Sequence, residues 1–190
     1  MTLSELRGFD DNVYEPAEDS ALLADVAVGE VDREDCVLDV GTGSGYVAAT
    51  ITEATGAHVV GSDLNPHACR QARATGIPVV RGHLTQPFRT RTFDVVTFNP
   101  PYLPIAPAEE RDDWLEVALS GGASGRAIIE PFLDDVRRVL TPDGFVLLLT
   151  STVTDVDAVA RYAGDRGFGT VALRDVTYPG ETLMVLKLLG

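Results

Sequence analysis

The sequence predicts a doubly wound α/β fold, in which helices cover both faces of a mostly parallel sheet of seven strands. Two observations predict this class. Apolar runs rich in β-branched and aromatic residues alternate with helical patterns almost from end to end. The last two such runs are joined by a turn too short for a crossover helix, and only antiparallel neighbours can be linked so briefly. The length of 190 residues suits one domain, spanning 1–190.

The elements are expected in a regular order. The apolar, β-rich runs predict strands at 36–40, 58–62, 78–81, 93–98, 144–150, 170–176 and 183–188. The helical patterns predict helices at 19–28, 46–55, 66–75, 126–140 and 155–166. Because the turn Tyr178-Pro179-Gly180-Glu181 is so short, the last two strands should form an antiparallel hairpin at the end of the sheet.

Two stretches break this alternation: an N-terminal arm that runs to Pro16, and the segment 100–125. Long connections in such folds are usually lids or binding loops. We therefore expect the arm with the helix after it, residues 1–30, and the segment 100–125 to act as lids or binding loops.

The charge balance is strongly acidic, with 29 acidic against 15 basic residues and a net charge of −14. Lys187 is the only lysine, and the other fourteen cations are arginines. Concentrated salt screens the self-repulsion of such a chain, so the composition resembles that of halophilic proteins. It argues against a general electrostatic grip on nucleic acid, which requires a basic face.

The sequence shows no targeting or membrane signal. No apolar run approaches membrane-spanning length, and the N-terminus lacks the basic-then-apolar pattern of a signal peptide, so we expect a cytoplasmic protein. Cys36 and Cys69 have no His or Cys neighbours at ligand spacing. Each is expected to be a small core residue, and no metal site is predicted.

The motif Asn99-Pro100-Pro101-Tyr102 directly follows the strand predicted at 93–98. Its two prolines make a stiff turn with few free donors and press Asn99 toward an extended conformation. The Asn99 amide and the Pro100 carbonyl can then point together at a small, planar, nitrogen-bearing group. The alternative is that the motif only opens a loop.

A glycine-rich turn, Gly41-Thr42-Gly43-Ser44-Gly45, lies where the first strand gives way to a helix. Glycines there let the backbone approach a ligand, although Tyr46 stands where the dinucleotide fingerprint requires its third glycine. Asp63 ends the next strand about 20 residues later, where a carboxylate can accept bonds from two ribose hydroxyls. By itself Asp63 is equally suited to the turn before the helix that opens at Pro66.

Together these motifs resemble the class I S-adenosylmethionine-dependent methyltransferases of the Asn-Pro-Pro-Tyr group, whose sheet also ends in a reversed hairpin. The arm residues 14–23 and the segments 120–126 and 180–183 are similar to one branch of that group. This branch is the archaeal and eukaryotic (HemK-like) release-factor glutamine N5-methyltransferases. The likeness spans about residues 14–188.

The resemblance implies that the arm and helix at 1–30 close over the cofactor and that the loop at 100–125 covers the substrate. It also implies which residues form the site. Contacts to S-adenosylmethionine are implied for Ser20, Asp39, Gly41, Thr42, Gly43, Gly45, Asp63, Leu64, His83, Leu84 and Asn99. His83 stands where the family often has an acid that contacts the adenine. Substrate binding is implied for Asn99, Pro100, Pro101 and Tyr102, with catalysis by Asn99, Pro100 and Tyr102.

The implied activity is N5-methylation of the glutamine in the Gly-Gly-Gln motif of a class 1 translation termination (release) factor. The implied partner is a small zinc-binding activator protein that forms a heterodimer by adding a strand to the edge at 77–81. Two alternatives stay open: N6-adenine methylation of nucleic acid, and a noncatalytic module that binds S-adenosylmethionine. The first lacks a basic stripe, and an intact Asn-Pro-Pro-Tyr motif argues against the second.

Overall fold

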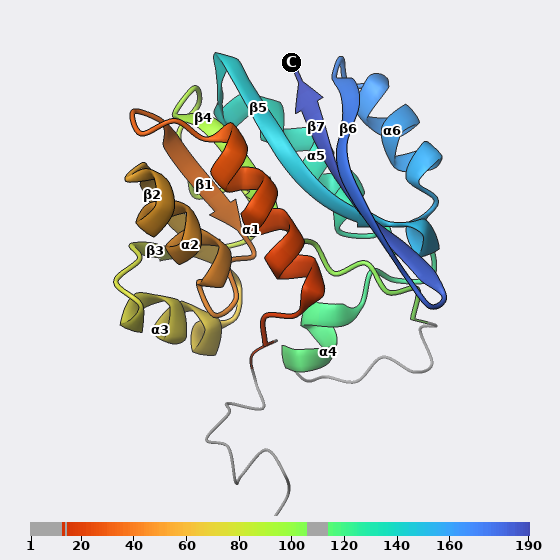
Figure 1. Ribbon diagram of the computed structural model, residues 1–190, viewed down its shortest axis with the longest axis horizontal. Helices are drawn as coiled ribbons and strands as arrows, with labels where there is room; N and C mark the ends of the chain where they lie inside the picture. Colours follow the sequence, from red (N-terminus) through yellow and green to blue (C-terminus); the bar gives the residue numbers. More distant parts are fainter. Residues whose placement is uncertain (1–12, 14, 106–113) are drawn as a thin grey trace, which may run out of the picture.

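A computed structural model describes residues 13, 15–105 and 114–190 of the chain (Figure 1). The strands within these ranges are β1 (Cys36–Val40), β2 (His58–Asp63), β3 (Val79–Arg81), β4 (Phe93–Phe98), β5 (Leu140–Ser151), β6 (Gly169–Tyr178) and β7 (Glu181–Leu189). The helices are α1 (Glu18–Glu30), α2 (Tyr46–Thr55), α3 (Pro66–Ala74), α4 (Trp114–Leu119), α5 (Ile129–Val139), α6 (Val156–Gly164) and a 3₁₀ turn, η1 (Thr152–Thr154).

The seven strands form one sheet in the order β3-β2-β1-β4-β5-β7-β6. Strands β1 to β5 are parallel, and β7 runs antiparallel to both β5 and β6. The chain order reverses between β1 and β4, which is the point where open α/β sheets bind their ligands at the carboxyl ends of the strands. The predicted doubly wound fold and its C-terminal hairpin are confirmed.

The core has two halves, one on each face of the sheet. One half joins α1 and α2 to residues such as Val37, and the other joins α5 and α6 to residues such as Leu38 (Figure 1). Successive residues of a strand point to opposite faces, so neighbours on β1 enter different halves. Both side chains are fully buried. This double burial holds the carboxyl ends of the central strands in fixed positions.

The structure corrects three boundaries. Helix α4 lies inside the segment 100–125, which was expected to be a loop without a helix. Helix α5 begins at Ile129, three residues later than predicted, with Pro131 in its first turn, where no backbone donor is needed. Strand β5 begins at Leu140, because Leu140 pairs with Phe93 across an irregularity in the ladder.

No helix in the described ranges is long and apolar enough to span a membrane.

Candidate active site

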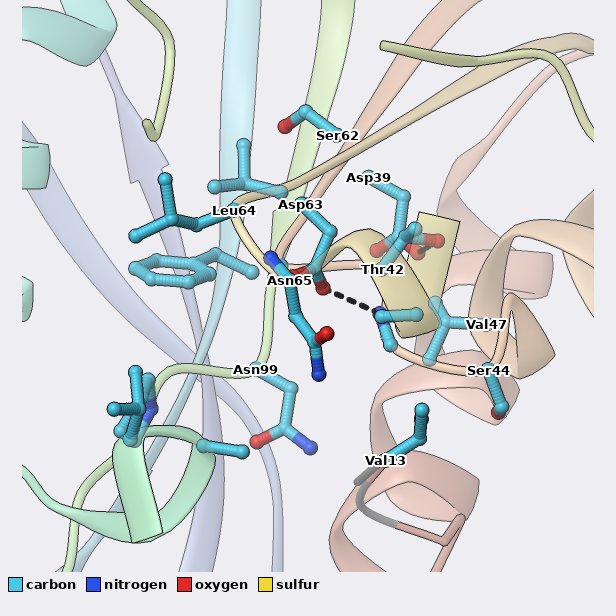
Figure 2. Close-up of a pocket in the computed structure, with 18 of the residues that line it drawn as sticks. Val13, Asp39, Thr42, Ser44, Val47, Ser62, Asp63, Leu64, Asn65 and Asn99 are labelled. Atoms are coloured by element: carbon cyan, nitrogen blue, oxygen red, sulfur yellow. Dashed lines mark hydrogen bonds between the residues drawn. The ribbon is translucent and has the colours of Figure 1, made fainter. Parts of the chain in front are cut away.

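A pocket lies at the carboxyl ends of β1, β2 and β4, between α1 and α4 (Figure 2). It brings together most of the predicted site residues: Ser20, Asp39, Gly41, Thr42, Gly43, Asp63, Leu64, His83, Leu84, Asn99 and Pro101. Val13 and Pro16 of the arm line it as well. Residues far apart in the sequence therefore meet at the switch point of the sheet.

The glycine-rich turn is fastened to the end of β2. Gly41 and Gly43 have φ values of +62° and +55°, a region that side chains disfavour. The Thr42 N–H donates to the Ser62 carbonyl at 2.9 Å, and the Gly43 N–H donates to Asp63 Oδ2 at 2.9 Å (Figure 2). The turn is thus preformed, with its backbone facing the pocket.

Asp39 stabilises the glycine-rich turn through hydrogen bonds. Its side chain is buried and accepts hydrogen bonds from the hydroxyls of Thr42 at 2.6 Å and Thr97 at 2.7 Å. Burial raises the pKa of Asp39 to about 6, although the two hydroxyl bonds favour the charged form. Asp39 therefore ties β1, β4 and the glycine turn together at the floor of the pocket.

Asp63 links the glycine turn to the loop after β2. Besides the bond from Gly43, its Oδ1 accepts from the Asn65 N–H at 2.8 Å. Burial raises the pKa of Asp63, against the lowering effect of these N–H groups. Each carboxylate oxygen has two lone-pair sites, so Asp63 retains acceptor capacity toward the pocket that it lines. Such a carboxylate can hold the two hydroxyls of a ribose.

The Asn99 amide is held in one orientation. Its Nδ2 donates to Ser20 Oγ at 3.3 Å, and Ser20 Oγ in turn donates to Asp19 Oδ1 at 3.2 Å. Asn99 Oδ1 is buried and has no hydrogen-bond partner among the described residues. A buried acceptor without a partner is costly, so this oxygen is poised for a donor from a bound molecule (Figure 2).

Three predicted site residues do not line the pocket. A Cβ on Gly45 would come within 2.9 Å of Ala72, so this glycine permits close packing of α2 on α3. Pro100 is buried, and the Tyr102 side chain packs against the core half that contains α1. In this structure Pro100 and Tyr102 therefore shape the wall behind Asn99 and Pro101.

Helix α4 supplies pocket residues that sequence reasoning missed. Trp114, Val117 and Ala118 of this helix line the pocket. Their signal was present, because apolar residues recur at helical spacing from Trp114 onward and end at Ser120 before two glycines. Ser44, Ser62 and Asn65 were also missed, although they adjoin predicted residues.

Comparison with known proteins shows that the chain is similar to methyltransferases. Residues 37–122 match the model of a methyltransferase domain. The chain is 34% identical to a Methanocaldococcus jannaschii protein that carries the name "putative protein N5-glutamine methyltransferase", over 92% of this chain and 90% of the relative. It is also 34% identical to the human methyltransferase HEMK2, over 95% of this chain and 91% of the relative.

A solved structure is similar over nearly the whole chain. The Mtq2–Trm112 complex of E. cuniculi is described as responsible for methylation of the eRF1 translation termination factor. Its matching chain is 31% identical with a TM-score of 0.77, over 94% of this chain and 98% of that one.

Proposed function

Since the chain belongs to the HemK2-type protein N5-glutamine methyltransferases, we propose that it methylates the glutamine of the Gly-Gly-Gln motif in a class 1 translation termination factor. The observation that carries the proposal is the buried Oδ1 of Asn99 at the pocket wall, which has no hydrogen-bond partner within the described part of the chain. A glutamine side-chain amide offers the planar N–H donor that this oxygen lacks. Such work belongs to the cytoplasm, where translation terminates.

The pocket residues suit S-adenosylmethionine as the cofactor. The backbone of Gly41 and Gly43 would hold the amino-acid end, Asp63 would accept the ribose hydroxyls, and the apolar side chains of Leu64 and Leu84 would flank the adenine. All five residues line the pocket. When bound, the cofactor supplies a methyl group on a sulfonium that an amide nitrogen can attack. His83 lines the pocket next to Leu84, in the position proposed for adenine contact.

The protein's contribution to the reaction is orientation. An amide nitrogen is a poor nucleophile, because its lone pair is delocalised into the carbonyl. Asn99 Oδ1 accepts one N–H of the glutamine amide, and this bond holds the nitrogen in line for attack. Pro100, whose carbonyl the sequence predicts as the second acceptor, is buried and does not line the pocket in this structure. As positive charge develops on the amide nitrogen, Asn99 Oδ1 binds it more strongly, and this differential binding accelerates the step. The proton then leaves to a carbonyl oxygen or to water.

Mass spectrometry tests the proposed activity. The chain is incubated with its activator, labelled S-adenosylmethionine and a termination factor that carries Gly-Gly-Gln. We expect one added methyl group on the glutamine, and none when that glutamine is replaced by alanine. Labelling of another residue of the factor, or of adenine in added DNA with the factor unmodified, would contradict the assignment.

We further propose that a small zinc-binding activator of the Trm112 type pairs with strand β3, the sheet edge at residues 77–81. The support is the similar chain that was solved in a complex with Trm112. Strand β3 is an edge of the sheet, where backbone groups are available to an added strand. Ile77 and Val79 pack into the core, and Val80 is exposed.

The backbone of β3 alternates in direction. The Pro78 carbonyl accepts from the Gly61 N–H, and the Gly82 N–H donates to the Asp63 carbonyl. Residues 78, 80 and 82 therefore direct their backbone groups to β2, and Val79 and Arg81 direct theirs outward. A hydrogen bond from Arg73 supports this assignment. Its Nη2 donates at 2.7 Å to the Val79 carbonyl, which therefore faces away from β2. The Val80 N–H therefore faces β2, and replacing Val80 by proline would not remove a donor to an added strand.

Val79→Pro should weaken activator binding while the chain stays folded. Proline is tolerated on an edge strand where the lost N–H faced outward, but it removes a donor from the added strand and obstructs its approach. We expect the dissociation constant for the activator to rise at least tenfold in a titration, equivalent to about 1.4 kcal/mol. Val79→Thr, which keeps the N–H and the β-branch, should bind normally. A folded Val79→Pro variant with unchanged affinity would move the interface elsewhere.

The acidic composition supports a halophilic protein, and it predicts a steep dependence of stability on salt. The Debye length is about 8 Å at 0.15 M salt and about 3 Å at 1 M, so molar salt screens the repulsion of a net charge of −14. We expect the melting temperature to rise continuously as KCl is added and the chain to unfold or aggregate at low salt. A melting temperature that does not change with KCl would mean that the acidic residues serve another purpose, such as a partner surface.

A further inference from the structure

The segment between α4 and α5, residues 120–126, lies directly against the exit of the Asn-Pro-Pro-Tyr turn. We call this segment the glycine clasp. Its Gly121 N–H donates to the Leu103 carbonyl at 2.9 Å, the Leu103 N–H donates to the Leu119 carbonyl at 3.1 Å, and Leu103 pairs with Ser120 in an isolated β-bridge. The clasp thus continues the Asn99 wall as a short two-stranded contact.

Two glycines make this contact possible. A Cβ on Gly125 would stand 2.6 Å from the Tyr102 carbonyl oxygen and 3.0 Å from the Thr154 methyl group. A Cβ on Gly121 would stand 2.6 Å from the Gly125 carbonyl oxygen. Gly125 also has a φ of +71°. The backbone of the clasp therefore touches the backbone of Tyr102 at a distance that no side chain permits.

Arg126 anchors the clasp on its other side. Its Nη1 donates to the Thr154 carbonyl at 2.7 Å, and its Nε lies 3.4 Å from Glu130 Oε1. Thr154 is itself buried, with its hydroxyl bonded to the Ser151 carbonyl at 2.7 Å. The clasp is thereby fixed to the end of β5 through η1.

No residue of the clasp lines the pocket, yet it is held between the end of β5 and the Tyr102 backbone. We propose that the glycine clasp is a positioning element that sets Tyr102 and, through the stiff prolines before it, the placement of Asn99 toward the substrate amide. Arg126 is a positioning residue in the same sense. The expected effect of the clasp on kcat rests on the proposed function. Its effect on the placement of Asn99 does not depend on the substrate.

Gly125→Ala tests the proposal against a matched control, Gly180→Ala. Gly180 has a φ of +98° and nothing within 4 Å of an added Cβ, so its substitution brings the same backbone strain without the contact. A displacement of about 1 Å at a reacting group costs about 10²-fold in rate. We therefore expect Gly125→Ala to lower kcat about 10²-fold with the dissociation constant for S-adenosylmethionine changed less than threefold. Gly180→Ala should retain the wild-type kcat.

A second readout needs no substrate. The Asn99 side-chain amide signals, identified in nuclear magnetic resonance spectra by their loss in Asn99→Ala, should shift in Gly125→Ala and stay in place in Gly180→Ala. If the wild type does not methylate the termination factor but these shifts occur, the proposed function fails and the positioning role stands. Unshifted signals in a folded Gly125→Ala would overturn the positioning role, as would a kcat equal to that of the wild type.

Arg126→Met covers the case in which Gly125→Ala does not fold, because it loosens the clasp without inserting an atom into the contact. We expect a roughly tenfold lower kcat with unchanged cofactor affinity, and partial recovery in Arg126→Lys, which can still reach the Thr154 carbonyl. A wild-type kcat in Arg126→Met, or no recovery in Arg126→Lys, would overturn the role of Arg126.

Discussion

Asn99→Ala is expected to lower the rate of methyl transfer about 10²–10³-fold while the affinity for S-adenosylmethionine changes less than threefold. The expected size is that of removing one preorganised hydrogen-bonding group from an active site, about 2.7–4 kcal/mol of transition-state stabilisation. Asn99 Oδ1 is the acceptor in question, buried at the pocket wall without a partner among the described residues. Single-turnover rates with the termination factor and calorimetry with the cofactor separate the two effects.

Ser20→Ala tests the same site with a smaller change than Asn99→Ala. It leaves the Asn99 acceptor in place but removes the bond of 3.3 Å that fixes the amide, so we expect a loss of kcat smaller than that of Asn99→Ala. If Asn99→Ala reduced cofactor affinity as much as rate, Asn99 would belong chiefly to the cofactor pocket. Full activity of a folded Asn99→Ala variant would refute the mechanism.

The sequence predicted those parts of the site whose residues lie close together in the chain. The glycine turn and Asp63 each follow a strand directly, so a segment of about ten residues contains both the strand and the site residue that follows it. Parallel strands end at one edge of a sheet, and this rule alone brings Gly43 and Asp63 together. The structure joins them by a hydrogen bond of 2.9 Å.

The orientation of Asn99 depends on a residue distant in the sequence. Its amide donates to Ser20, which is 79 positions away on α1. The sequence favoured both residues for the site, but it contains no signal for a bond between them. Which amide atom faces the substrate is decided by this tertiary contact.

Helix α4 and the direction of the β3 backbone were not predicted for a similar reason. Six residues are too few to form a stable isolated helix, so α4 depends on the packing around it. The outward direction of Val79 follows from the pairing of Gly61 with Pro78, which the apolar pattern of β3 does not specify. In both cases a neighbouring element selects one of several local conformations.

Asp63→Ala is expected to weaken S-adenosylmethionine binding about 10²–10⁴-fold. Hydrogen bonds to a charged acceptor contribute about 1.5–3 kcal/mol each, and two ribose hydroxyls would lose this acceptor, a total of about 3–6 kcal/mol. The substitution also frees the Gly43 N–H, which Asp63 Oδ2 holds at 2.9 Å, so the preformed turn loses its tie to β2. Calorimetry in concentrated KCl measures the affinity under conditions that screen the acidic chain.

Two variants separate the ribose contact from general effects. Asp143→Ala removes the same charge from an exposed position outside the pocket and should bind the cofactor normally. Asp63→Asn keeps one oxygen acceptor but sets an amide NH₂ against either the Gly43 N–H or the Asn65 N–H, so it should weaken binding by an intermediate amount. Wild-type affinity in a folded Asp63→Ala variant would show that Asp63 does not bind the ribose. Asp63 would then have only a structural role, in which its bond from the Asn65 N–H holds the turn after β2.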